Sequence, residues 1–235
     1  MKTFAMEDVE FVLDPRPGNQ RGVSSSNRFI LVKSDALLDT YRNWRFKRPE
    51  TILELGLFEG GSLVLLDKLF QPKTLVGLDI RADPIVPLEE YRERNPHVLT
   101  HYGLSQDRPD VLRVARQHFP QGIDLVVDDA SHHYAPTKAS FEMLFPLLGV
   151  GGVYLIEDWA WSHRPGQQSA DAPWANAPAL TNLVMELVVM AAAHGAVAEV
   201  AIFSEAVAVV RGPGPMPGDP FDLSGALRGR TLGTL

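Results

Sequence analysis

Residues Ile123 to Trp159 read IDLVVDDASHHYAPTKASFEMLFPLLGVGGVYLIEDW, and this stretch contains two apolar runs that each finish in adjacent acids. The runs occupy residues 123–127 and 153–156, and the segment between them has helical length, which predicts strand, helix, strand. The acids that end the runs are Asp128, Asp129, Glu157 and Asp158. Because the carboxyl ends of parallel strands lie side by side at the edge where ligands bind, we expect these four acids to converge.

The same alternation extends to both sides of this stretch. Strands are expected at residues 51–55, 74–78, 98–102, 123–127, 153–156, 197–202 and 206–210. Helices are expected near residues 61–70, 84–94, 108–119 and 137–148, and from Leu180 to Ala191. This rhythm predicts an α/β fold with a Rossmann-like, doubly wound sheet of seven strands. Hairpin spacing between the last two strands predicts that the last strand is antiparallel.

The chain divides into three parts. An N-terminal cover segment with a helix is expected at residues 1–49, the sheet domain at 50–211 and a C-terminal tail at 212–235. Residues 1–27 lack a clear period and are rich in turn formers, which predicts a loop, a cover or a partly disordered segment. The helix is expected in the second half of Arg28 to Arg48, with basic residues at its solvated end. The tail, rich in Gly and Pro, is expected either to wrap a neighbouring surface or to stay mobile.

Composition excludes several classes of protein. A chain of 235 residues with 45% hydrophobic side chains fits one globular domain with an ample core. A net charge of −7 argues against a duplex nucleic-acid binder, and the lack of cysteine excludes disulfides and thiolate chemistry. The acidic N-terminus does not resemble a signal peptide, and the longest apolar stretch, Leu183 to Ala193, is too short to span a membrane. We therefore expect a cytoplasmic protein without nucleic-acid or membrane partners, and the sequence leaves open whether it forms a homo-oligomer.

Clustered acids require a counter-charge. Like charges repel unless protons or cations neutralise them, and oxygen-rich sites suit magnesium, calcium or manganese. The pair His132 and His133 follows the first two acids and should reach the same edge. A divalent metal site is therefore our first hypothesis. The alternative, solvated strand ends, is disfavoured because two acid pairs follow two strands.

The turn after the first strand of the sheet reads ELGLFEGGS, from Glu54 to Ser62. It lacks the lysine of a P-loop and the glycine spacing of the dinucleotide fingerprint. Glu54 would repel phosphate and attract an ammonium, and Asp79 ends the second strand where an acid takes ribose hydroxyls. A ligand with ribose, an amino group and no phosphate suggests S-adenosylmethionine. The alternatives are that Glu54 caps the following helix and that Asp79 pairs with Arg81.

The motifs ExGxxxGxS, LDI and IDLVVDD, together with the closing hairpin, resemble the class I S-adenosylmethionine-dependent methyltransferases over roughly residues 50 to 211. This resemblance implies the class I methyltransferase fold. The stretch DDASHHYAPTKASFEMLFPLLGVGGVYLIEDW is similar to the magnesium-dependent sugar O-methyltransferases of macrolide biosynthesis and their relatives, which include the cephalosporin hydroxylase-like family. The cofactors so implied are S-adenosylmethionine and Mg²⁺ or Mn²⁺. The implied acceptor is a sugar, an oligosaccharide or a glycosylated natural product.

The resemblance also implies roles for single residues. Metal binding falls to Asp129, Glu157 and Asp158, and His132 is the implied base. The residues implied in cofactor binding are Glu54, Gly56, Ser62, Asp79, Ser105, Gln106 and Asp128. Adjacent strand residues point to opposite sides, which suits one aspartate toward the cofactor and its neighbour toward the metal. For Glu157 and Asp158 to bind one ion, the strand must end at Glu157.

The expected reaction is transfer of a methyl group from S-adenosylmethionine to a hydroxyl group of the acceptor. An alcohol has a pKa of ~16 and a free imidazole ~6.5, a gap of ~9 units or about 12 kcal/mol, so a base alone is inadequate and a metal is needed. The alternatives are an NAD(P)-dependent oxidoreductase, which the glycine spacing disfavours, and a non-catalytic partner protein that keeps the cofactor fold. Three tryptophans, Trp159, Trp161 and Trp174, are expected either to pack or to stack on a sugar.

Overall fold

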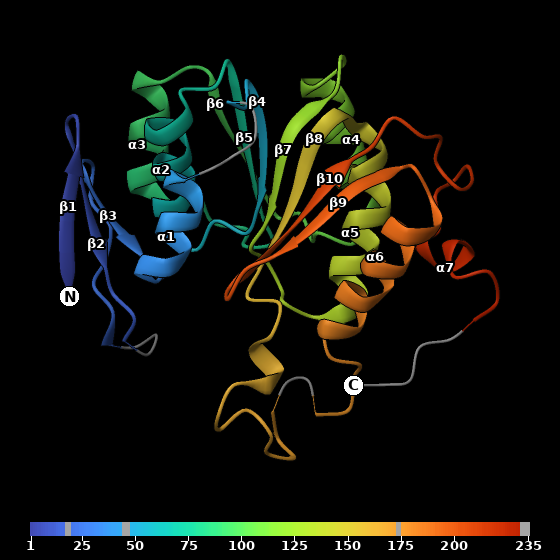
Figure 1. Cartoon of the computed structure of the whole chain (residues 1–235). Coiled ribbons are helices and arrows are strands. Elements are labelled where there is room, and N and C mark those ends of the chain that lie inside the picture. The colour runs from blue at the N-terminus through green and yellow to red at the C-terminus, as the bar shows by residue number, and fades with distance from the viewer. Residues whose placement is uncertain (17–19, 44–47, 173–174, 231–235) are drawn as a thin grey trace.

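The computed structural model describes residues 1–16, 20–43, 48–172 and 175–230. Trp174 lies outside these ranges, as do residues 44–47 near the end of the stretch in which the first helix was expected. A seven-stranded sheet forms the centre of the molecule, with the strand order β6-β5-β4-β7-β8-β10-β9 (Figure 1). Its strands are β4 (Thr51–Leu55), β5 (Thr74–Asp79), β6 (Val98–Tyr102), β7 (Ile123–Asp128), β8 (Leu148–Glu157), β9 (Val197–Ile202) and β10 (Ala206–Arg211).

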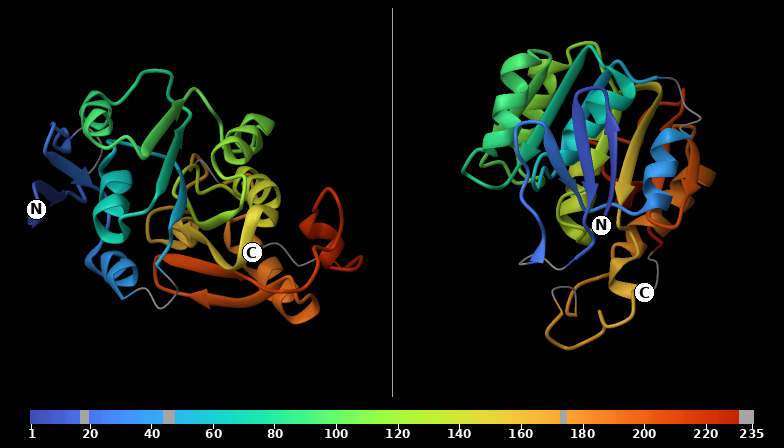
Figure 2. Two further views of the ribbon diagram at one scale, coloured as in Figure 1. Left: turned by 90° about the horizontal axis from the view of Figure 1, so that it is seen from above. Right: turned by 90° about the vertical axis from the view of Figure 1, so that its left-hand side faces the viewer.

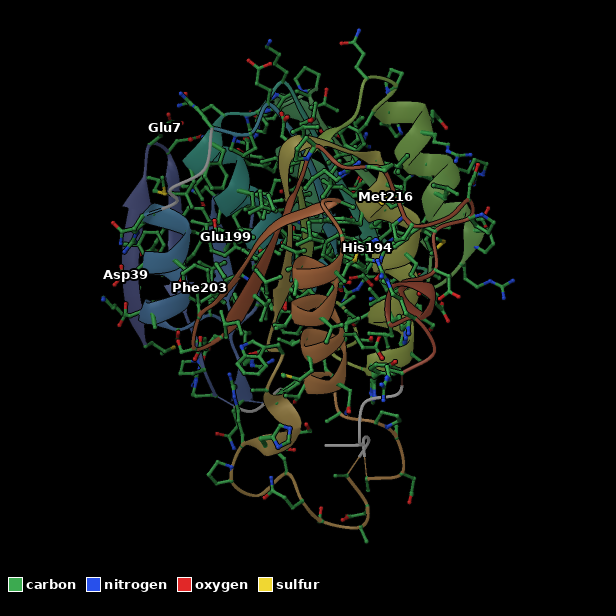
Figure 3. The ribbon with its side chains drawn as sticks, turned by 45° about the vertical axis from the view of Figure 1, so that its right-hand side comes forward. Glu7, Asp39, His194, Glu199, Phe203 and Met216 are labelled. Carbon is green, nitrogen blue, oxygen red and sulfur yellow. The ribbon has the colours of Figure 1, made fainter. Side chains whose placement is uncertain are left out.

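The direction of the strands agrees with the sequence prediction. The strands β4 to β8 pair in parallel, whereas β10 is antiparallel to both of its neighbours, β8 and β9. The strand β8 begins at Leu148, five residues before the predicted apolar run. Its glycine-rich first half also belongs to the strand, and it pairs with β7 through a register shift. In Figure 3, the label Glu199 marks β9 at the edge of the sheet, beside α6, and Phe203 marks the turn that follows it.

Helices cover both faces of the sheet (Figure 2). One buried apolar cluster contains side chains of α1 (Asp35–Arg42), α2 (Gly61–Phe70) and α3 (Val86–Arg94). The other contains side chains of α4 (Pro109–His118), α5 (Tyr134–Leu144), α6 (Thr181–Ala193) and the short α7 (Leu223–Ala226). Two 3-10 turns, Phe145–Leu147 and Trp161–His163, also lie within the described ranges. None of the helices within the described ranges is long and apolar enough to cross a membrane.

The N-terminal segment differs from its expectation. The prediction of a loop over residues 1–27 is wrong, because β1 (Lys2–Met6), β2 (Val9–Leu13) and β3 (Arg28–Leu31) form a second, three-stranded sheet. Figure 2 shows this sheet in front of the molecule in its right-hand view. A Cβ atom on Gly61 would lie 2.2 Å from the carbonyl oxygen of Ile30, so the glycine lets β3 lie against the start of α2.

The described part of the C-terminal tail wraps a neighbouring surface, one of the two outcomes expected. Its α7 carries the fully buried Leu223, whose backbone N–H donates to Glu142 Oε1 at 2.9 Å. Lys138 Nζ donates to Ser224 Oγ at 3.0 Å. Figure 3 labels His194, after α6, and Met216, in the tail, on the same side of the molecule. The tail therefore packs on α5 and α6, away from the carboxyl ends of the parallel strands.

Candidate active site

The glycine turn brings the backbone of β4 against the end of β7. Gly56 has a φ of +88°, and a Cβ atom there would lie 2.3 Å from the carbonyl oxygen of Asp129. Its backbone N–H donates to the carbonyl oxygen of Leu78 at 2.8 Å. Only glycine satisfies both the left-handed conformation and the close approach. The turn forms one wall of a cavity of about 390 Å³.

This first cavity is lined by four of the residues predicted to bind the cofactor: Gly56, Asp79, Ser105 and Gln106. Asp79 also orders the turn, because its Oδ2 accepts from the backbone N–H groups of Leu57 at 2.8 Å and Phe58 at 3.3 Å. Its Oδ1 lies 3.8 Å from Arg81 Nε, so the ion pair considered as an alternative is formed as well. Oδ1 also accepts from the backbone N–H of Arg81 at 2.8 Å, so one of the four lone-pair sites of the carboxylate, on Oδ1, remains for a ligand.

Asp128 lies behind the wall of this cavity and does not line it. Its Oδ2 accepts hydrogen bonds from Tyr154 Oη and Ser140 Oγ, both at 2.7 Å. Gln106 Nε2 donates to Asp128 Oδ1 at 3.0 Å, while Gln106 Oε1 accepts from the backbone N–H of Ser131 at 2.9 Å. Burial raises the pKa of Asp128, and the Tyr154 and Ser140 hydroxyls lower it. This network fixes Gln106, which faces the cavity.

Glu54 is fully buried and is not among the residues that line the cavity. No hydrogen bond of good geometry reaches either carboxylate oxygen from the described residues, and the hydroxyl of the adjacent Ser62 is likewise unsatisfied. Burial raises the pKa of Glu54 to about 8, against the opposing effect of the Lys33 ammonium. An acid buried without a donor is costly, so this position suits a ligand that brings a positive charge.

A second cavity, of about 510 Å³, adjoins the first and shares Phe58, Asp129 and Ala130 with it. Its lining includes Ser62, His132 and Asp158 among the predicted site residues. Among the described residues, Asp129, His132 and Asp158 form a group in which one ligand atom from each lies within 4.8 Å of the others. These three donors can hold a metal ion at the boundary of the two cavities.

The end of β8 meets one condition for a shared ion, the end of the strand at Glu157, but of the two acids only Asp158 belongs to the three-residue group. The strand ends at Glu157, and Asp158 turns away from it with a φ of +51°. Arg164 donates to Asp158 Oδ1 at 2.9 Å and lies 3.8 Å from Glu205. Burial raises the pKa of Asp158, while the charges of His132, Arg164 and Lys33 lower it and that of Asp129 raises it.

The two adjacent histidines have different surroundings. His132 has a φ of +56°, and its Nε2 lies 3.8 Å from Asp129 Oδ1. The Trp161 ring packs edge-on against its imidazole, with 5.0 Å between the ring centroids. His133 precedes α5 as its N-cap residue, and its backbone N–H donates to Ser131 Oγ at 3.2 Å. Of the two side chains, only that of His132 lines the second cavity.

Glu157 contacts the N-terminal segment instead of the three-residue group. Lys33 Nζ donates to Glu157 Oε2 at 2.6 Å and to Asp129 Oδ2 at 3.0 Å, and the Tyr41 hydroxyl donates to Glu157 Oε1. Burial and the charge of Asp129 raise the pKa of Glu157 to about 7, against the effects of Lys33 and Tyr41. Burial lowers the pKa of Lys33, but the carboxylates outweigh this effect and hold it above its ordinary value.

Sequence reasoning missed four residues of this site: Lys33, Tyr41, Arg164 and Glu205. Lys33 precedes Asp129 by 96 residues and Glu157 by 124. No periodicity or spacing links positions so far apart. The sequence offered one signal for Lys33: it directly follows the apolar run of β3, so its side chain starts beside buried residues.

No family model matches the chain. The chain is 32% identical over 130 residues to 8-demethyl-8-alpha-L-rhamnosyl tetracenomycin-C 2'-O-methyltransferase of Streptomyces olivaceus. This alignment covers 52% of this chain and 32% of that protein. It is 35% identical over 133 residues to mycinamicin VI 2''-O-methyltransferase of Micromonospora griseorubida, which covers 54% of this chain and 30% of the relative. The matched region thus spans about a third of the length of these relatives.

Solved structures agree with these sequence relatives. MycE methyltransferase from the mycinamycin biosynthetic pathway, in complex with Mg, SAH and mycinamycin VI, superposes with a TM-score of 0.57 at 26% identity. The superposition covers 74% of this chain and 48% of that one. An O-methyltransferase from Bacillus cereus, at 18% identity and a TM-score of 0.51, shares the fold. The chain therefore has the class I methyltransferase fold and is similar to O-methyltransferases of sugar-bearing natural products, which confirms the resemblance predicted from its motifs.

Proposed function

We propose that this chain transfers a methyl group from S-adenosylmethionine to a hydroxyl group of a sugar or glycosylated acceptor, with the help of a divalent metal ion. The observation that carries this proposal is the junction of the two cavities at Asp129. One cavity presents the glycine turn and the carboxylate of Asp79. The other presents His132 and the acids of the candidate metal group. A methyl donor and an acceptor would therefore meet beside the ion.

The first cavity suits S-adenosylmethionine. Asp79, Ser105 and Gln106 offer polar atoms to a nucleoside, and Glu54 offers a buried acid to the amino group of the methionine part. Gly56 lets the backbone approach the ligand closely, whereas Ser62, at the start of α2, lines the second cavity. The Asp128 network would act indirectly, by fixing Gln106. The bound cofactor would supply an electrophilic methyl group.

The charges around the second cavity suit a divalent cation. Four acids, Asp129, Glu157, Asp158 and Glu205, share two cationic side chains, Lys33 and Arg164. When all four acids are ionised, the group has a formal charge of about −2, which one Mg²⁺ or Mn²⁺ would neutralise. Asp129 and Asp158 would hold the ion with His132 adjacent, and Glu157 would join them where Lys33 yields its oxygen. The ion would supply the Lewis acidity that lowers the pKa of an acceptor hydroxyl.

His132 is the side chain that we assign as general base. It faces the second cavity, and the adjacent Trp161 ring holds its imidazole toward Asp129. In this position it would accept the proton of the acceptor hydroxyl. Trp161 also lines the cavity, where it can stack on a sugar ring. Trp159 packs instead, since it contacts the apolar core and its Nε1 donates to the carbonyl oxygen of Phe203 at 3.0 Å.

The acceptor class follows from the relatives. Their names place the methyl group on the sugar of a tetracenomycin and on mycinamicin VI, so a glycosylated small molecule is the first acceptor to test. The net charge of −7 disfavours a nucleic-acid substrate. We place the reaction in the cytoplasm, with which the cysteine-free composition is compatible. Neither the oxidoreductase nor the non-catalytic alternative is favoured by these relatives.

Mass spectrometry on a panel of rhamnosylated and macrolide glycosides tests the proposal. With S-adenosylmethionine and Mg²⁺, one acceptor should gain the mass of one methyl group in exchange for hydrogen, and excess EDTA should abolish the gain. Calorimetry should show that the cofactor still binds in EDTA, because the first cavity is built without the ion. Full transfer in EDTA would refute the metal requirement. Binding of NADH in preference to S-adenosylmethionine would favour the oxidoreductase.

A further inference from the structure

The part of the chain from β3 through α1, residues 28–42, reaches into the acidic site with a buried cation and is called the β3–α1 segment below. Lys33 is 7% exposed, and its ammonium lies between Asp129 Oδ2 at 3.0 Å and Glu157 Oε2 at 2.6 Å. Both partners are residues to which the resemblance assigns metal binding. An ammonium buried between two carboxylates neutralises their charge, as a bound metal ion would.

Two more donors from the same segment bind acids of the site. The Ser34 hydroxyl donates to Glu205 Oε2, and the same oxygen caps α1 by accepting from the backbone N–H of Leu37 at 3.1 Å. The Tyr41 hydroxyl, on α1, donates to Glu157 Oε1. Both oxygens of Glu157 therefore accept from this segment. The segment is attached to the body of the protein by bonds to Asp129, Glu157 and Glu205, and the first two of these acids are ones that a metal ion would also use.

A divalent ion near Asp129 would meet the positive charge of Lys33. Like charges in a partly dry site repel strongly, because little water screens them. The ion can bind fully only if the ammonium moves away from Asp129 and Glu157 or if the ion tolerates its repulsion. Either outcome weakens metal binding and loosens the contacts of the segment.

We propose that Lys33 is a built-in cation of this site, which holds Asp129 and Glu157 in place before the metal binds and competes with the metal for them. Metal occupancy and docking of the β3–α1 segment are thereby coupled. The segment also lines the second cavity through Leu31 to Ser34 and Leu37, so the ion influences the wall against which an acceptor binds. This inference rests on the metal site of the proposed function.

Titration with Mn²⁺, followed by electron paramagnetic resonance of the free ion, tests the competition without any turnover. The variant Lys33→Met removes the charge and keeps the apolar stem, so it should bind Mn²⁺ at least about tenfold more tightly than the wild type. The matched control is Lys68→Met, since Lys68 also pairs with two acids, Glu7 at 2.8 Å and Asp8 at 2.9 Å, away from the site. The control should bind Mn²⁺ as the wild type does.

The outcomes separate this inference from the proposed function. Equal or weaker Mn²⁺ binding by a folded Lys33→Met protein, with a wild type that binds, refutes the competition and leaves the metal site standing. No Mn²⁺ binding by either protein at millimolar concentration refutes both. Tight binding by the variant alone supports the competition in its strongest form.

Hydrogen exchange of the wild type provides a test that does not depend on a variant. Saturating Mn²⁺ should reduce the protection of backbone amides in α1, including Leu37 and Leu38, because the anchoring bonds of Lys33 and Ser34 weaken. The strands β1 and β2 of the same small sheet serve as the internal control and should change less. Unchanged or increased protection of α1 in a protein that binds Mn²⁺ would contradict the coupling.

Discussion

Asp128 and Asp129 are neighbours in sequence, yet their carboxylates lie on opposite sides of the sheet. Asp128 accepts from Ser140 and Tyr154, both at 2.7 Å, within a buried network. Asp129 accepts from Lys33 at 3.0 Å at the junction of the two cavities. Side chains alternate between the two faces along a strand, and Asp129 directly follows Asp128, the last residue of β7. The two carboxylates therefore point to opposite sides. One acid pair thus supports the cofactor side and the ion side at once.

The two aspartates should respond differently to the same substitution. Asp128→Asn places an amide among hydroxyl and amide donors and should lower the free energy of unfolding by about 1 to 3 kcal/mol, with little change in Mn²⁺ affinity. Asp129→Asn removes one of the three candidate metal ligands. Because loss of an outer partner already costs about 10- to 100-fold in metal affinity, it should weaken Mn²⁺ binding at least about 100-fold. Chemical denaturation and Mn²⁺ titration of both proteins would test this difference. A loss of Mn²⁺ affinity in Asp128→Asn would contradict it.

Asp79 should matter to the cofactor in two ways. Asp79→Ala removes an acceptor for ribose hydroxyls and releases the turn amides of Leu57 and Phe58 that it holds. A hydrogen bond to a charged group contributes about 1.5 to 3 kcal/mol, so the dissociation constant of S-adenosylmethionine should rise about 10- to 100-fold. Asp83→Ala, in the following turn, is a control for loss of surface charge. An unchanged dissociation constant in a folded Asp79→Ala protein would show that the carboxylate serves the turn alone.

The sheet could be predicted because each of its elements carries its own signal. The strands β4 and β9 and the helix α2 have the predicted bounds, since alternating apolar runs and glycine punctuation mark them. The first two strands could not be predicted in this way. Residues Lys2–Met6 are largely exposed, and only Phe4 and Met6 pack against the core, which is too short an alternation to predict a strand from the sequence. The strand β1 is stabilised by pairing with β2, which the sequence does not record.

The candidate site could be predicted where it depends on strand ends and not where it depends on distant packing. Asp79, Asp129 and Asp158 follow strands whose carboxyl ends share one edge, so their convergence follows from the topology. Lys33 reaches Asp129 only because β3 packs on α2, and that contact depends on tertiary structure. The supporting role of Asp128 was hidden for the same reason, because its partners Ser140 and Tyr154 come from α5 and β8.

Binding of S-adenosylmethionine should release a proton near neutral pH. Burial raises the pKa of Glu54 to about 8, so the free protein holds this acid mainly protonated at pH 7, and an ammonium beside it favours the ionised form. Cofactor affinity should therefore rise from pH 6 to about 8 and then level off. Calorimetry in phosphate and in Tris, which differ in ionisation enthalpy, would report the proton as a buffer-dependent heat. Glu54→Gln should bind more weakly and lose this dependence, whereas equal heats for the wild type in both buffers would contradict the assignment.

The same acid should affect stability. The folded pKa of Glu54, about 8, exceeds its ordinary value of 4.5, so between these values the native state holds a proton that the unfolded state has lost. The contribution of Glu54 to stability should therefore fall as the pH rises through this window, and it should be constant above it. Denaturation of the wild type and Glu54→Gln in EDTA, from pH 5 to 9, would isolate this difference. A wild type that gains stability relative to the variant as the pH rises would contradict the sign.

His132 should be required for turnover, and His133 should not. A general base typically contributes 10²- to 10⁴-fold, so His132→Ala should lose about that much in kcat while it still binds the cofactor, and its rate should lose the acid limb that a titrating imidazole imposes. His133→Ala is the matched control, because that residue begins α5 and its side chain does not line the second cavity. Steady-state kinetics of both variants from pH 6 to 9, at saturating Mg²⁺, would compare them. A concurrent loss of Mn²⁺ affinity in His132→Ala would make the imidazole a metal ligand, since it lies in the same group as Asp129 and Asp158. Reversed effects of the two variants would make His133 the base, and a loss below about tenfold in both would assign the proton to water or to a carboxylate.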